Sequence, residues 1–106
     1  MKLLTKEIEE RLIKNFRANE KDGELDFKVV CKLFNPSGIG TWYLTELDPD
    51  TNIAYGLCCL HESEYGTVSI DELRELKLPP FGLGIERDKF FPINKYTIDY
   101  CKQLEQ

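Results

Sequence analysis

Residues 86 to 89 read Glu-Arg-Asp-Lys, and their types and spacing suit chemistry better than any other stretch of the chain. Successive side chains of an extended backbone project to opposite sides, so Glu86 and Asp88 share one side while Arg87 and Lys89 share the other. Two carboxylates so placed can hold a divalent cation, and a neighbouring lysine can assist phosphodiester hydrolysis. Further carboxylates for such a nuclease would come from Glu46, Glu62 or Glu64. The alternative, which we favour, is that these alternating charges pair with neighbours or stay solvated.

Two adjacent aromatic residues, Trp42 and Tyr43, are the next candidates for binding. If their strand is regular they lie on opposite faces, so one can belong to the core while the other is exposed. An exposed aromatic ring can stack on a base or pack against a partner protein. We expect Trp42 in the core. The candidate binding residues are therefore Trp42, Tyr43, Glu46, Glu86, Arg87 and Asp88.

Residues 48 to 52, Asp-Pro-Asp-Thr-Asn, carry oxygen ligands at alternate positions, as a calcium-binding loop does. Such a loop needs glycine at its sixth position and glutamate at its twelfth. Counted from Asp48, these positions hold Ile53 and Cys59. A tight turn explains the segment instead, because proline, aspartate and asparagine all favour turns. We predict no metal site and no cofactor.

The four cysteines are Cys31, Cys58, Cys59 and Cys101. The sequence lacks a C-x-x-C pair and a secretion signal, so we interpret them as reduced thiols that fill space in the core. The single histidine, His61, is predicted at a strand end on the surface. Sequence neighbours on a strand are poorly placed for a Cys-His nucleophilic pair.

A chain of 106 residues with 42% hydrophobic content fits one domain, residues 1–106, with a single core. Its formal net charge of -5 disfavours non-specific binding to nucleic acid, although a local basic patch is still allowed. Neither a signal peptide nor a membrane span is recognisable. We therefore expect a cytoplasmic protein.

The first half of the chain alternates between helical and strand periodicity. Apolar residues at four-residue steps predict an amphipathic helix over 4–16, capped by Thr5 and ending near 19–23. Residues 25–34 alternate between apolar and mostly charged side chains, which predicts a strand with one solvated face in an antiparallel sheet. Further strands are expected at 41–47 and 53–61, then a turn at 62–66 and an edge strand at 67–68.

The second half predicts two more helices. Ser69 and Glu72 form a capping box, and Pro79-Pro80 must follow the end of that helix. Residues 85–91 follow a glycine-containing loop as a brief extended segment. Asn94 is expected to cap a last helix that buries Tyr100, Cys101 and Leu104. The fold class is α+β: a small antiparallel meander of three to four strands, packed with an N-terminal helix, a helix after the sheet and a short C-terminal helix.

The order of these motifs resembles the bacterial family called domain of unknown function 2958. The similar stretches are MKLLTKEI, CKLFNP, TWYLTELDP, YGLCCLHESEYGTVSIDELREL and FGLGIERDKFF, which together span Met1 to Phe91. Members are short proteins that often accompany plasmids and conjugative elements. The resemblance implies a shared fold and a mobile-element setting, and it carries over no catalytic residue.

Three functions are compatible with the sequence. The first, which we prefer, is a non-enzymatic accessory domain that binds a protein encoded by the same element, because no catalytic constellation is recognisable. The second is the metal-dependent nuclease that uses Glu86 and Asp88. The third is a weak acidic DNA mimic, which would need carboxylates at phosphate-like spacing. The oligomeric state is open, because an exposed edge strand near Thr67 can pair with a copy of itself.

Overall fold

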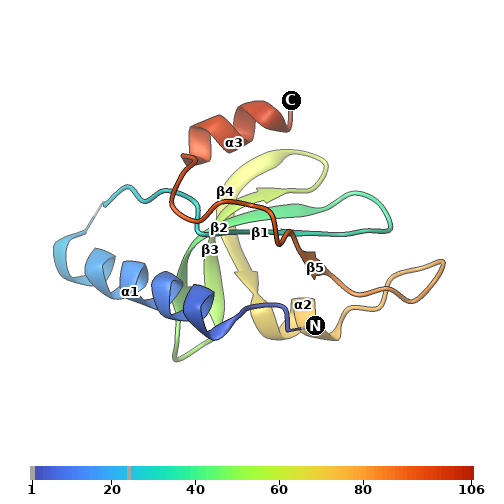
Figure 1. The fold of residues 1–106 in the computed structure, drawn as a ribbon, viewed down its shortest axis with the longest axis horizontal. Coiled ribbons are helices and arrows are strands. Elements are labelled where there is room, and N and C mark those ends of the chain that lie inside the picture. The colour runs from blue at the N-terminus through green and yellow to red at the C-terminus, as the bar shows by residue number, and fades with distance from the viewer. Residues whose placement is uncertain (1, 24) are drawn as a thin grey trace.

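The computed structural model describes residues 2–23 and 25–106. Its helices are α1 (Lys6–Asp22), α2 (Ile70–Glu75) and α3 (Ile98–Leu104). Its strands are β1 (Cys31–Phe34), β2 (Thr41–Asp48), β3 (Ile53–Cys59), β4 (Ser63–Ser69) and β5 (Glu86–Arg87). All five strands form one antiparallel sheet in the order β4-β3-β2-β1-β5 (Figure 1). The α+β class is confirmed, with β5 added because part of the predicted extended segment pairs with β1.

Helices α1 and α3 lie on opposite sides of the sheet (Figure 1). One core contains Ile8 and Leu12 of α1, whereas a second core joins Cys101 of α3 to Tyr43 and Leu57. As a result, residues 42–47 of β2 are all buried. The prediction of a sheet with one solvated face is therefore wrong, because α3 and the chain leading into it cover the second face.

The strand predicted over residues 25–34 forms only from Cys31 onward. Before that point the chain bonds to the segment that enters α3: Val29 N donates to Tyr96 O (2.7 Å), and Asn94 N donates to Val29 O (3.0 Å). Val29 and Val30 are both buried, so the predicted alternation of inside and outside fails there. Leu25, expected on the apolar side, is 39% exposed.

The first two helix caps are confirmed. Thr5 Oγ1 accepts from Ile8 N (3.1 Å), and Ser69 Oγ accepts from Glu72 N (3.2 Å). Each bond satisfies one of the amides that a helix start leaves without a partner. Helix α1 ends at Gly23, whose φ of 66° suits glycine, within the predicted limits.

The predicted cap of α3 is wrong. Asn94 has a φ of 59°, which is the left-handed region and not the extended conformation of an N-cap. Thr97 caps the helix instead, because its side chain accepts from Tyr100 N (3.1 Å). Cys101 is buried as expected, whereas Tyr100 and Leu104 are exposed.

Of the two turns predicted on either side of β3, one is confirmed and the other is wrong. The turn at residues 48–52 is confirmed, with Asp50 N donating to Asp48 Oδ1 (2.9 Å) and Asn52 in the left-handed region. The turn predicted at 62–66 is wrong, because β4 already begins at Ser63 and pairs with β3. Over the described residues, no helix has the length and apolarity to cross a membrane.

Candidate functional site

The structure brings Glu86, Arg87 and Asp88 together at an open cleft of about 580 Å³. The cleft lies between the hairpin that joins β1 to β2 and the chain that follows β5. Its walls include Lys32, Phe34, Asn35, Gly38, Gly40, Thr41, Lys89 and Phe90. Three of the predicted binding residues therefore share one site, and Glu46 is not part of it.

Asp88 is used to hold the local backbone. Its Oδ1 accepts from Phe90 N (2.9 Å), and its own N–H donates to Lys32 O (2.9 Å). Its Oδ2 lies 4.0 Å from Lys32 Nζ, and both side chains are about one-third exposed. An aspartate that bonds the amide two residues onward fixes a turn. The carboxylate therefore positions Phe90 at the rim of the cleft.

Arg87 ties the beginning of the chain to β5. Its Nη1 donates to Lys2 O (2.8 Å) and to Leu3 O (2.9 Å). Both acceptors are backbone carbonyls, so the guanidinium supports the fold at this edge. Within residues 2–23 and 25–106, no three His, Cys, Asp or Glu side chains gather closely enough to hold a metal ion.

Trp42 and Tyr43 both lie in the core, so neither offers an exposed ring for stacking. Trp42 is 7% exposed and Tyr43 1%. Tyr43 Oη donates to Glu105 Oε2 (3.0 Å), and Lys32 Nζ lies 5.5 Å from the centroid of its ring. Burial, together with the Glu105 carboxylate, raises the pKa of Tyr43 well above its usual range. The burial of Trp42 is confirmed.

Glu46 owes its place to a β-bulge. Leu44 pairs with Gly56 and Glu46 with Tyr55, so Thr45 is an extra residue in β2. Leu47 consequently joins the same core as Leu44, which turns Glu46 to the opposite face. The spacing of Leu44 and Leu47 by three positions is the signal in the sequence that indicates such a bulge.

The Glu46 residue is only 5% exposed, and both hydrogen-bond donors to its carboxylate are uncharged side chains. Asn19 Nδ2 donates to its Oε1 (3.0 Å), and Tyr65 Oη donates to its Oε2 (3.3 Å). Partial burial and the Glu46 carboxylate raise the pKa of Tyr65, so its hydroxyl remains a donor at neutral pH.

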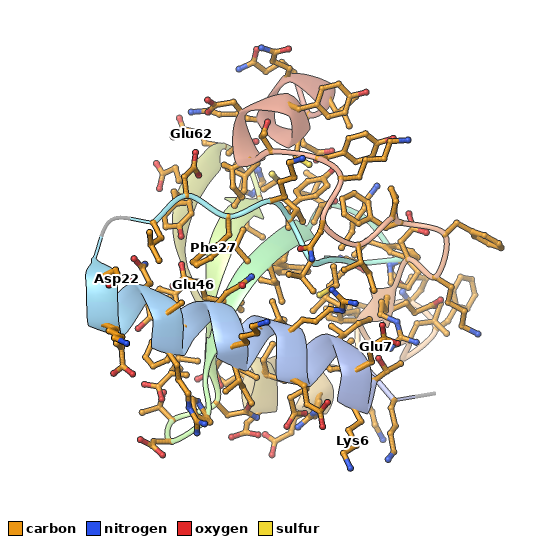
Figure 2. The ribbon with its side chains drawn as sticks, turned by 60° about the vertical axis from the view of Figure 1, so that its left-hand side comes forward. Lys6, Glu7, Asp22, Phe27, Glu46 and Glu62 are labelled. Atoms are coloured by element: carbon orange, nitrogen blue, oxygen red, sulfur yellow. The ribbon has the colours of Figure 1, made fainter. Side chains whose placement is uncertain are left out.

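A small cavity of about 250 Å³ opens beside this carboxylate. Figure 2 shows Glu46 and Phe27 close together, between α1 and the chain that precedes β1. The remaining walls are Leu25, Asp26, Thr45, Tyr65 and Ile98. This Glu46 cavity combines one buried carboxylate with aromatic and aliphatic surface, and we did not predict it from the sequence.

The thiols are protonated structural groups. Burial raises the pKa of Cys31 to about 12 despite the nearby charge of Arg87, and it raises that of Cys101 to about 11. All four cysteines lie within the described residues and are unpaired, as predicted. His61 is exposed at the turn after β3, also as predicted. Protonated thiols are weak nucleophiles and weak metal ligands.

Comparison of the sequence with known protein families gives a match over nearly the whole chain. The family model described as "Protein of unknown function (DUF2958)" matches residues 3–105. No curated protein and no solved structure matches the chain.

Proposed function

Since the chain belongs to the DUF2958 family, whose description assigns no activity, we propose its function from its own surface. The protein is a non-enzymatic protein-binding domain, and the cleft between the β1–β2 hairpin and residues 86–90 is its contact surface. The expected partner is a protein encoded by the same mobile element.

The exposure of Phe90 carries this proposal. Its side chain is 95% exposed, more than any other large apolar residue of the described chain. It stands at the rim of a cleft that also contains the half-buried Phe34. Exposed aromatic residues beside a recess are the usual anchors of protein interfaces. The Asp88 bond fixes the backbone of Phe90, which lowers the entropy lost when a partner binds.

The charges of the cleft fit a binding surface better than a catalytic one. Asp88 is paired with Lys32, and the guanidinium of Arg87 is bound to backbone carbonyls. Glu46 lines a different cavity, so it adds no carboxylate to Glu86 and Asp88. Glu86 and Lys89 remain at the rim, where charges contribute mainly to the rate and specificity of association.

The test compares two exposed phenylalanines. Phe81 is 80% exposed but does not line the cleft, so F81A is a matched control for F90A. We expect a partner captured from the native host to bind wild type and F81A equally, and to bind F90A at least about 30-fold more weakly, the loss typical of an interface anchor. Circular dichroism checks that both variants fold. Equal binding of the two variants, or no reproducible partner, would contradict the proposal.

A further inference from the structure

Glu46 is a buried carboxylate that belongs to no ion pair of the described residues. The ion pairs within 4.0 Å in residues 2–23 and 25–106 join Glu7 to Arg11, Lys32 to Asp88 and Asp71 to Arg74. Glu46 is in none of them. A buried carboxylate is costly unless charge and hydrogen bonds compensate it. Asn19 and Tyr65 supply the hydrogen bonds, and no ion pair among the described residues supplies Glu46 with a positive charge.

The free acceptor positions of Glu46 match the geometry of one kind of donor, the guanidinium group. A carboxylate oxygen has two lone pairs, and each oxygen of Glu46 receives one donor from the protein. One position therefore remains on each oxygen. A planar guanidinium presents two parallel N–H groups that match such a pair of oxygens, whereas an ammonium group is a point charge.

From this arrangement we propose that the Glu46 cavity binds one guanidinium group. Phe27 and Tyr65 contribute aromatic rings to the lining, and aromatic rings are surfaces on which a guanidinium can stack. Leu25 and Ile98 provide apolar surface for the methylene chain that carries it. Asp26 adds a second negative charge to the lining. Its volume of about 250 Å³ lies below the ~300–1,000 Å³ of drug-sized pockets, so it suits one extended side chain.

Two sources share this chemistry, namely an arginine side chain of a partner protein and a free guanidino compound. The probes are propylguanidinium, arginine blocked at both ends, and an arginine-centred tripeptide. Blocked lysine and blocked citrulline are the controls, since one replaces the fork by a point charge and the other keeps the shape without the charge. Binding is followed by amide chemical shifts in NMR titrations of the full chain.

We expect saturable shifts that centre on residues 45, 46, 65 and 98, with millimolar affinity for propylguanidinium. Blocked lysine is expected to bind about tenfold more weakly than blocked arginine, and blocked citrulline is expected not to saturate. A tripeptide that binds at least about tenfold more tightly than propylguanidinium identifies an arginine of a protein as the source. Comparable affinities identify a free guanidino compound, and both results support the cavity.

The deciding variants are E46Q and E86Q. E46Q keeps the shape and one acceptor, and it is expected to weaken guanidinium binding at least about tenfold, because the charge is lost. E86Q and F90A change the other cleft and are expected to bind the probes as wild type does. Thermal unfolding checks that E46Q is folded. No saturable shift with any guanidinium probe, or equal affinity in E46Q, would overturn the proposal, and neither result bears on the cleft around Phe90.

Discussion

The two carboxylate sites of this protein are built in opposite ways. Asp88 is about one-third exposed, lies beside Lys32 and bonds the adjacent backbone, so its charge is used within the fold. Glu46 is buried, and its hydrogen-bond partners are the uncharged Asn19 and Tyr65. A partly exposed ion pair contributes little and tolerates change, whereas a buried charge without a counter-ion is costly to keep. The buried Glu46 is therefore the stronger indication of a binding site, although the charged run at residues 86–89 is the more conspicuous pattern in the sequence.

The largest expected effect removes the strand geometry beside the bulge that positions Glu46. A Cβ at Gly56 would overlap Tyr43 O and would lie 2.9 Å from Leu44 Cα, next to the bulge. We expect G56A to lower the free energy of unfolding by about 3 kcal/mol or more, since backbone cannot move aside cheaply. Chemical denaturation measures this loss. G66A is the matched control in β4, because its Cβ would meet nothing within 4 Å, and it should change stability by less than about 1 kcal/mol.

The next largest effect is a difference in stability between variants of Glu46 and variants of Glu86 in the cleft. E46L leaves Asn19 and Tyr65 without their acceptor, so we expect a loss of about 1–3 kcal/mol of unfolding free energy. E86L changes a half-exposed residue of the cleft and should stay within about 0.5 kcal/mol of wild type. E46Q keeps an acceptor and removes the buried charge, so it should be as stable as wild type or more stable. Equal losses in E46L and E86L would remove the distinction between the sites.

A smaller loss of stability is expected only at alkaline pH, and it reports on two buried thiols, one near each site. Cys31 lies in β1 beside β5, and Cys101 lies in α3, whose Ile98 lines the Glu46 cavity. Burial raises the pKa of Cys31 from 9.0 to about 12, and that of Cys101 from 9.0 to about 11. Above pH 9 the unfolded state loses these protons while the folded state keeps them, so stability falls as pH rises.

For each thiol we expect a loss on the order of 1–2 kcal/mol between pH 8 and pH 10.5. The pH dependence of urea denaturation measures this loss. C31A and C101A should each remove part of the slope. An unchanged slope in C31A would show that the surroundings of β1 are wetter than their burial indicates.

The sequence predicts the elements whose signals are local. Thr5 and Ser69 are caps because a hydroxyl reaches an amide three residues onward, and nothing distant is involved. The turn at residues 48–52 is similarly set by its own side chains. Glu86 and Arg87 fall within the predicted extended segment, although their strand exists only because it pairs with the distant β1.

Features that depend on distant segments are not predictable in the same way. Residues 25–30 look like a strand, but Val29 bonds to Tyr96 and Asn94, far along the chain. Tyr43 is buried because α3 covers it, and α3 itself has only a weak sequence signal. The face on which Glu46 lies depends on one extra residue at Thr45, and a shift of one position reverses every side chain that follows.

The position of β4 at the outside of the sheet has a practical consequence. Its outer backbone groups face no other strand of the described chain, and such an edge is a template for pairing between molecules. Glu62 precedes this strand and Glu64 lies in it, and their negative charges repel a second copy. Acidification toward the isoelectric point of about 4.9 removes the net negative charge that keeps whole molecules apart. Fibrous or amorphous precipitate should therefore form in mildly acidic buffer, and neutral to slightly alkaline storage should prevent it.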